Sequence, residues 1–329
     1  MIRLAGVESR RLFARRLTVI GVAAVLVITA FLLFATWREA RPLSAAQQQQ
    51  AQQQFDQAQK DWQLHGEEYK KRCETDWKAQ PDPKPVLADF CQVVEPKLEQ
   101  FGKPKTVFAE LMPNLLLGSS YLLAFAAFVI GASFIGAEFS SGAIGNWLTF
   151  EPRRLRVYGS KLVAAALGMA PLAVVVLAVL TAGTWLIIRH YGTVDSTTGK
   201  VWGDLAGTAG RSVALTAGTG ALGGVAALLL RHTAAAIGVA MGYLVLIEGV
   251  FGGFLMKFQP WLAKANFDAW IAHGTSYYVQ ECQTMSDGNY NCNSIEKTLS
   301  FEHGAWYLGI FAVVLIAAGA LVFNRRDVN

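Results

Sequence analysis

The stretch LVAAALGMAPLAVVVLAVLTAGTWLII, residues 162–188, contains no charged side chain. A hydrocarbon core about 30 Å thick is crossed by roughly 20 helical residues, each rising about 1.5 Å. The stretch is therefore long enough to cross a membrane as one helix. The composition agrees, because the mean hydropathy is +0.32 and 16% of the residues are charged, against about 25% in soluble proteins.

Five further apolar stretches reach the spanning length. They are residues 17–36, 113–137, 212–230, 233–256 and 304–323. None alternates as the strands of a membrane barrel do, so the predicted fold class is all-α, a polytopic membrane protein with six transmembrane helices. The first stretch is longer than the roughly 7–15 apolar residues of a signal peptide and precedes WREARPLSAA, a poor cleavage site, which predicts a retained anchor.

The distribution of basic residues predicts the orientation. With the N-terminus inside, the cytoplasmic pieces hold twelve Lys and Arg against four acids, whereas residues 38–110 hold eleven bases and twelve acids. Cytoplasmic loops carry the excess of Lys and Arg. Both termini and residues 138–161 are therefore predicted to be cytoplasmic.

The four cysteines all fall in the segments predicted to lie outside. An oxidising compartment favours two disulfides, and the pairs Cys73–Cys91 and Cys282–Cys292 are the simplest of three connectivities. The alternatives are free thiols or a metal site. No CxxC motif and no histidine at zinc-finger spacing is present, so no metal site is expected.

The segments between the spans have distinct compositions. Residues 1–16 predict either an amphipathic helix on the inner surface or a basic tail that sets orientation. In the insert, Phe55, Trp62 and Tyr69 repeat every seven residues, which predicts a helix that returns over residues 86–101 as a hairpin; a flexible stalk is the alternative. The predicted order is 1–16 interfacial helix, 17–36 span 1, 37–112 extracytoplasmic helical insert, 113–137 span 2, 138–161 cytoplasmic segment, 162–188 span 3, 189–211 external loop, 212–256 spans 4 and 5, 257–303 external loop with re-entrant short helices, 304–323 span 6 and 324–329 cytoplasmic tail.

Spans 4 and 5 carry small residues and one acid. The pairs Gly220/Gly224, Gly238/Gly242 and Gly249/Gly253 match GxxxG, a pattern that lets helices pack closely. Glu248 lies within a span, where an acid costs roughly 2.5–3.5 kcal/mol on insertion scales. It is expected either to line a substrate path or to hydrogen-bond a neighbouring helix.

The sequence lacks the motifs of an enzyme. It has no GxxxxGK[ST] phosphate loop, no HExxH, no GxSxG and no buried relay of acids and bases. The chain is therefore not expected to be an enzyme, to hold a cofactor or to bind nucleic acid. Active transport would require a partner that hydrolyses nucleotide.

The cytoplasmic segment EFSSGAIGNWLTFEPRRLRVYGSK, residues 138–161, resembles the corresponding segment of type-2 ABC exporter permeases. The resemblance is carried by Glu138, Gly142 with Ala143, Leu148, Pro152, Arg153 or Arg154, and Lys161, in that order. The tail FNRRDVN is also similar to the family's ending. The segment departs from the family in having Ala143 where threonine is usual, and the external insert is longer.

The resemblance implies a permease subunit that pairs with a second permease and with two copies of an ABC ATPase subunit, which bind ATP and Mg. Residues 140–150 would form the coupling helix, with an apolar face of Ile144, Trp147, Leu148 and Phe150 seated on the ATPase. Pro152 would end this helix, and Arg153 and Arg154 would meet lipid headgroups. An interfacial helix anchored by Trp147 without a partner is the alternative.

The expected function is export of a drug-, peptide- or lipid-like substrate across a bacterial plasma (inner) membrane. A competing hypothesis is a non-transporting sensor or accessory protein whose external domain binds a ligand or partner. An ATP-independent carrier is a third. A neighbouring reading frame for an ATPase would favour the first, and one for a kinase or sigma factor would favour the sensor.

Overall fold

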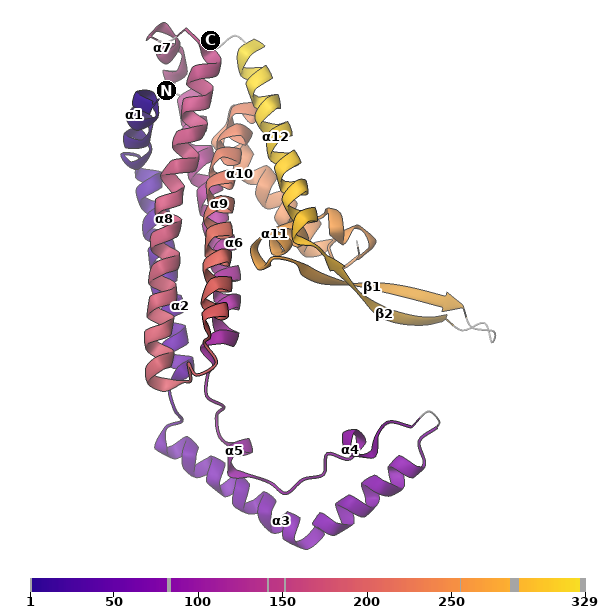
Figure 1. Ribbon diagram of the computed structural model, residues 1–329. Coiled ribbons are helices and arrows are strands. Elements are labelled where there is room, and N and C mark those ends of the chain that lie inside the picture. Colours follow the sequence, from indigo (N-terminus) through magenta and orange to yellow (C-terminus); the bar gives the residue numbers. More distant parts are fainter. Residues whose placement is uncertain are drawn as a thin grey trace.

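A bundle of long helices forms the centre of the computed structural model, which describes residues 2–81, 84–140, 142–150, 152–254, 256–284 and 290–325 (Figure 1). Six helices of the described residues are long and apolar enough to cross a membrane. They are α2 (Arg16–Ala40), α6 (Phe108–Ser140), α8 (Arg154–Tyr191), α9 (Gly199–Leu230), α10 (Thr233–Gly242) continued by the π-helix η1 (Tyr243–Val250), and α12 (Phe301–Arg325). The prediction of a six-span, multi-pass protein is confirmed at this level.

The remaining elements lie at the two ends of this bundle or, in the case of α11 and the two strands, beside it (Figure 1). They are α1 (Ile2–Phe13), α3 (Ala45–Lys78), α4 (Leu87–Phe90), α5 (Leu98–Phe101), α7 (Ala143–Phe150), the 3₁₀-helix η2 (Met256–Trp261), α11 (Ala263–Ala272), β1 (Thr275–Thr284) and β2 (Tyr290–Leu299). α1, α7 and the last turn of α12 lie at one end, here called the termini end, and α3 lies beyond the other, here called the insert end (Figure 1).

The core of the bundle is the packing of α6 and α8 against α9. Of the 18-residue apolar stretch of each helix, 50% of the residues are buried in α6, 44% in α8 and 56% in α9. The corresponding shares are 17% in α2, 6% in α10–η1 and 11% in α12. α6 and α9 approach most closely at glycines, since a Cβ on Gly131 would collide with the Gly220 carbonyl and one on Gly223 with the Phe128 carbonyl. Backbones can meet at this distance only where no side chain intervenes.

The GxxxG motifs differ in whether they contact a neighbouring helix. Gly220 and Gly224 pack against α6, as predicted. Gly238, Gly242 and Gly253 have open space where a Cβ would stand, so they make no such contact within the described chain. The link between spans 4 and 5 is short, because α9 ends at Leu230 and α10 begins at Thr233.

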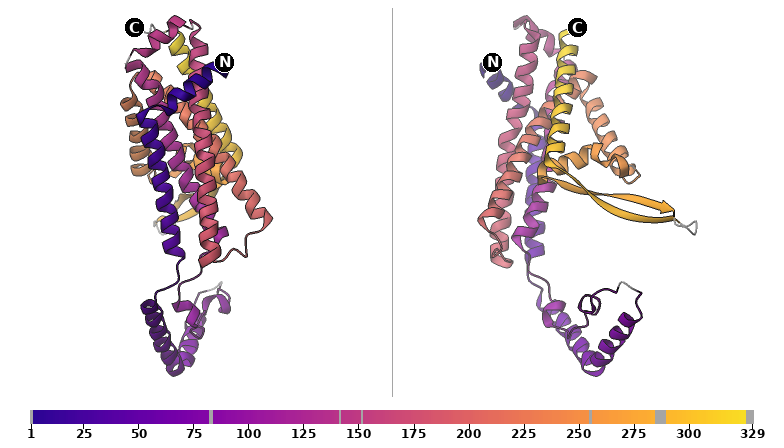
Figure 2. Two further views of the ribbon diagram at one scale, coloured as in Figure 1. Left: turned by 90° about the vertical axis from the view of Figure 1, so that its left-hand side faces the viewer. Right: turned by 45° about the vertical axis from the view of Figure 1, so that its right-hand side comes forward.

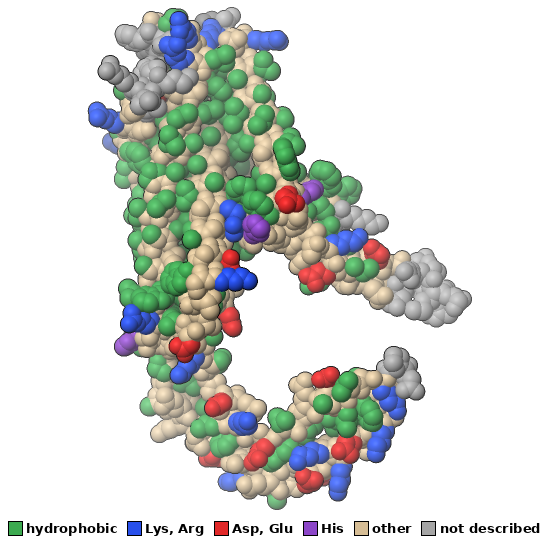
Figure 3. Space-filling model, viewed as in Figure 1, with side chains coloured by type: hydrophobic (Ala, Val, Ile, Leu, Met, Phe, Trp, Pro, Cys, Tyr) green, Lys and Arg blue, Asp and Glu red, His purple; other side chains and the backbone are tan. Residues whose placement is uncertain are grey.

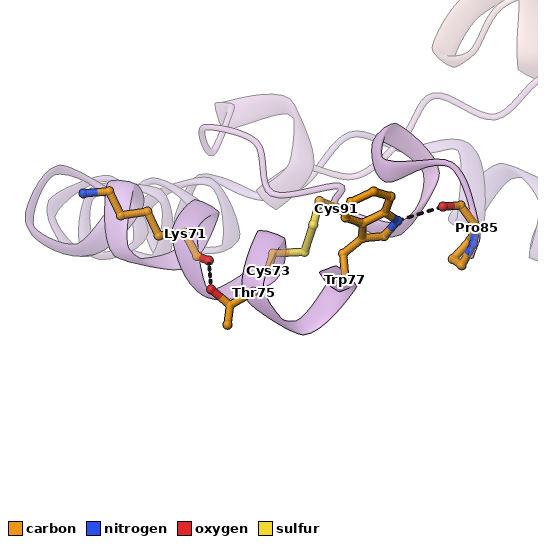
Figure 4. Close-up of a disulfide and its surroundings, with 6 residues drawn as sticks. All are labelled: Lys71, Cys73, Thr75, Trp77, Pro85 and Cys91. Atoms are coloured by element: carbon orange, nitrogen blue, oxygen red, sulfur yellow. Dashed lines mark hydrogen bonds between the residues drawn. A yellow bond between two sulfur atoms is a disulfide. The ribbon is translucent and has the colours of Figure 1, made fainter. Parts of the chain in front are cut away.

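The insert is built on α3, which starts with a capping box. Gln47 N–H donates to Ser44 Oγ over 3.4 Å, and Ser44 N–H donates to Gln47 Oε1 over 3.0 Å. The return segment of the same chain covers the predicted aromatic seam at Phe55, which contacts Phe101 with ring centroids 6.0 Å apart, whereas Tyr69 is 38% exposed. A disulfide joins Cys73 to Cys91, and Trp77 Nε1 donates to the Pro85 carbonyl (Figure 4).

The prediction of one continuous second helix over residues 86–101 is wrong. The structure has two single-turn helices there, α4 and α5, joined by an extended stretch. Pro96 lies in this stretch, and a proline in a helix interior removes one backbone hydrogen bond and clashes with the preceding turn. The Cys73–Cys91 bond, rather than a continuous helix, holds this segment on α3.

The segment between spans 5 and 6 contains a β-hairpin, which the all-α prediction did not include, within a chain that is otherwise helical. β1 and β2 pair antiparallel, with Cys282 opposite Cys292 and Val279 opposite Ile295 (Figures 1 and 2). The predicted disulfide joins the first pair. Two-stranded hairpins are marginal alone, and a cross-strand covalent bond supplies what a third strand would otherwise provide. The predicted short helices are present as η2 and α11.

Candidate functional site

The polar segment between spans 2 and 3 is closed by an ion pair between its first and last residues. Lys161 Nζ lies 2.5 Å from Glu138 Oε2, and the two side chains are 3% and 2% exposed. Glu138 lies in the last turn of α6, and Lys161 lies two turns into α8. The segment that carries α7 therefore leaves and re-enters the bundle at one fixed point.

The N-terminal residues add three charges to this point, Glu8 and Arg11 from α1 and Arg15 from the link to α2. Lys161 Nζ lies 2.9 Å from Glu8 Oε1 of α1. Arg11 Nη1 lies 3.8 Å from Glu8 Oε1 and 3.6 Å from Glu138 Oε1, and Arg15 Nη2 lies 3.4 Å from Glu138 Oε1. These five residues, Glu8, Arg11, Arg15, Glu138 and Lys161, are here called the ion cluster.

Three members of the ion cluster, Glu8, Glu138 and Lys161, have side chains only 1–3% exposed, whereas Arg11 and Arg15 are 38% and 24% exposed. A charge removed from water costs several kcal/mol, and opposite charges and hydrogen bonds must offset that cost. Arg15 Nη1 donates to the Ser133 carbonyl over 2.9 Å, and its guanidinium lies 5.2 Å from the centre of the Phe134 ring. Burial lowers the pKa of Arg15 and the Glu138 carboxylate opposes this shift. An arginine remains a cation under such a shift.

α1 is also held by apolar packing. Leu12 is fully buried and its Cδ2 lies against the Cα of Gly168 in α8, where a Cβ would be 2.5 Å away. Leu12 belongs to a buried cluster with Phe134, Ile144 and Phe323, which come from α6, α7 and α12. The N-terminal residues thus form a helix integrated into the termini end, rather than the basic tail that the sequence also allowed.

α7 is the helix predicted to bind an ATPase, and it begins three residues later than expected. Gly142 precedes it with φ at +68°, a left-handed conformation that favours glycine. Ile144 is 1% exposed and packs in the internal apolar cluster, so its predicted place on the partner-facing surface is wrong. The side chains of Trp147, Leu148 and Phe150 lie outside the described residues.

The turn after α7 joins the end of the last span. α8 begins at Arg154, directly after Pro152 and Arg153, in agreement with a helix that ends at the proline. Tyr158 Oη donates to the Ile316 carbonyl over 2.8 Å, and Arg154 Nη1 donates to the Phe323 carbonyl over 3.5 Å. The end of α12 is therefore fastened to the start of α8.

Glu248 lies in η1, apart from the ion cluster, and is hydrogen-bonded to a neighbouring helix. Its Oε1 accepts from the Tyr243 hydroxyl over 2.8 Å and from the Lys264 N–H over 3.1 Å. Ala263 N–H donates to the Tyr243 hydroxyl over 3.1 Å, so the pair caps the first turn of α11. This is the helix-to-helix contact that the sequence offered as one of two interpretations; the substrate path stays a prediction.

The structure thus brings some of the predicted site residues into contact and places further residues beside them. Glu138 meets Lys161, while Arg153 and Arg154 lie nearby at the same end. Glu8, Arg11 and Arg15 were not predicted as site residues. Their only signal was a single acid among the arginines of the first sixteen residues, and the contacts span more than 100 positions of sequence.

Comparison with known proteins adds no family assignment. No protein-family model, no curated protein and no solved structure matches the chain. Among the described residues, no group of three or more His, Cys, Asp and Glu is placed to hold a metal ion. The arrangement at the termini end is therefore interpreted from its own geometry: buried charges join α1, α6 and α8, and the short helix α7 packs against them through Ile144.

Proposed function

We propose that the chain is the membrane-spanning permease subunit of an ATP-driven exporter, with α7 as the contact to separate ATPase subunits. The observation that supports this most directly is the ion cluster. It joins Glu138 in the last turn of α6 to Lys161 of α8, so the two spans that flank α7 are fixed to each other. A force applied to α7 would then act on two core spans rather than being lost in a flexible loop.

The proposed mechanism is alternating access. ATP and Mg bind to two ATPase subunits, whose closure moves α7 and the equivalent helix of a second permease. The spans then change from an opening on the cytoplasmic side to an outward exit for a drug-, peptide- or lipid-like substrate. In this proposal the termini end is cytoplasmic, in a bacterial inner membrane, in line with the distribution of basic residues.

The test is capture of an ATPase subunit, chosen from a neighbouring reading frame where one encodes an ATPase. We expect Trp147→Glu/Leu148→Glu to lose co-purification with it, because two carboxylates would be placed in an apolar contact. The matched control is Leu64→Glu/Val94→Glu, which makes equivalent changes at positions that are 78% and 64% exposed on the insert. Equal capture by the first variant and the unaltered protein would refute the proposal.

A second candidate function is that of a sensor or accessory protein, which is favoured by the structure of the insert. α3 is 34 residues long, projects beyond the bundle and is fixed by a disulfide (Figures 1 and 4). A stapled helical domain of this kind suits ligand or partner binding. Capture of an ATPase through α7, retained when the insert is altered, would favour the exporter.

A further inference from the structure

A shallow hollow lies at the termini end between the start of α8 and the end of α12. It has a volume of about 410 Å³ and is lined by Pro152, Arg153, Arg154, Leu155 and Asn324. The end of the bundle that holds it also gathers basic side chains on the surface, whereas the sides of the bundle are largely apolar (Figure 3). The hollow is separate from the buried ion cluster.

The hollow has a positive lining. Two of its five lining residues are arginines and none is an acid. Arg153 is exposed, and Arg325, also exposed, follows the lining residue Asn324 in the last turn of α12. Guanidinium groups bind phosphate through paired N–H donors, so a phosphate group is the complementary ligand.

An apolar strip leads away from the hollow along the membrane-facing side. Leu155, which forms part of the lining, is 53% exposed. On α12, Val314 and Leu321 are each 58% exposed and are seven residues apart, and Arg325 follows four residues after Leu321. Residues at these spacings share one face of a helix. A ligand bound here would meet a cationic group at one end and an apolar surface at the other.

We propose that this hollow binds the phosphate of an anionic phospholipid, with its acyl chains along Val314 and Leu321. A free phosphate would use the arginines alone and gain nothing from the apolar strip. A phospholipid would use both, and the hollow lies at the end of the apolar part of two spans, where headgroups are found. The hollow lies next to the proposed ATPase contact, since Pro152 follows the end of α7 by two residues, but lipid binding can be tested without an ATPase.

The test is lipid binding by the full chain in detergent micelles. Phosphatidylglycerol, phosphatidylcholine and inorganic phosphate are each titrated, and bound lipid is counted by native mass spectrometry together with the thermal unfolding midpoint. We expect phosphatidylglycerol to bind and raise the midpoint, and the other two ligands to do neither. At about fivefold per basic residue near a membrane surface, Arg153→Gln should weaken binding about fivefold and Arg153→Gln/Arg154→Gln about 25-fold.

The control variant is Arg38→Gln/Arg189→Gln, which removes two arginines near the insert end. It should leave the affinity unchanged. Because Arg154 also donates to the Phe323 carbonyl, the single variant at Arg153 keeps the test valid where the double variant unfolds. Equal binding of phosphatidylcholine, an equal shift with inorganic phosphate, or equal loss in the control variant would each overturn the lipid site.

Discussion

Removal of the Lys161 ammonium should destabilise the protein far more than removal of a surface lysine. In Lys161→Met the side chain keeps its length, but the contacts of 2.5 Å to Glu138 and 2.9 Å to Glu8 are lost. The two carboxylates stay buried, with side chains 1–2% exposed. Removing one partner of a buried ion pair lowers the free energy of unfolding by about 3–5 kcal/mol.

The assay is the thermal unfolding midpoint of the purified protein in detergent. At about 2 °C per kcal/mol for a chain of this size, the expected loss is roughly 6–10 °C. The matched control is Lys297→Met in the β-hairpin. Its ion pair with Glu281 is also short, 3.1 Å, but the side chains are 45% and 49% exposed. Exposed pairs contribute about 0–1 kcal/mol, so the control should lose at most about 2 °C.

A double-mutant cycle distinguishes loss of the ion pair from loss of packing. Glu138→Gln alone should also destabilise, because it leaves three cations opposite one carboxylate. The combination with Lys161→Met should cost less than the sum of the two single changes, by about 1–3 kcal/mol, since neither partner then remains unpaired. Additive effects, or a loss in Lys161→Met no larger than that in Lys297→Met, would refute the argument that the ion cluster is a coupled buried unit.

Two further predictions concern other parts of the chain. Glu248→Ala should destabilise the protein by about 1–3 kcal/mol, because a first-turn amide of α11 and the Tyr243 hydroxyl lose their acceptor. Glu248→Gln keeps an acceptor oxygen and should retain most of the stability. Equal losses in the thermal unfolding midpoint of the two variants would contradict this. On α3, hydrogen bonds from Tyr69 and then His65 lower the pKa of Asp61 below its usual 3.8. A group with a depressed pKa contributes stability that is present above its unfolded pKa and is lost as the pH falls through its folded pKa. The protection factors of the α3 amides, which correct for the intrinsic pH dependence of exchange, should therefore fall below about pH 4, and Asp61→Asn should abolish this dependence.

The fold was predictable wherever one local property decides it. Spanning helices follow from uninterrupted apolar length, and the two disulfides follow from nearest neighbours among cysteines. The β-hairpin was not predictable in this way, because TSYYVQECQT mixes apolar and polar residues without a clear period. Its strands are defined by pairing between residues 6 to 24 positions apart, and the position of Cys282 opposite Cys292 is visible only once that register is known.

The candidate site shows the same division between local and long-range information. Glu138 and Lys161 stood out in the sequence because they are the first and last residues of a polar segment between apolar stretches. Their contact, however, depends on how α6 and α8 pack. Glu8 gives the ion cluster its second carboxylate, and it reaches Lys161 only because Leu12 seats α1 on α8.

This geometry bears on how α7 could act. A short helix joined to its spans by flexible links could rotate without moving them. Here the segment is closed by a buried ion pair and shares its apolar cluster with α1, α6, α8 and α12 through Ile144. Movement of α7 would therefore either pull Ile144 out of this apolar cluster or carry with it α6 and α8, which the ion pair joins. Because Ile144 is 1% exposed, the second is the expected route by which a partner at the termini end would act on the spans.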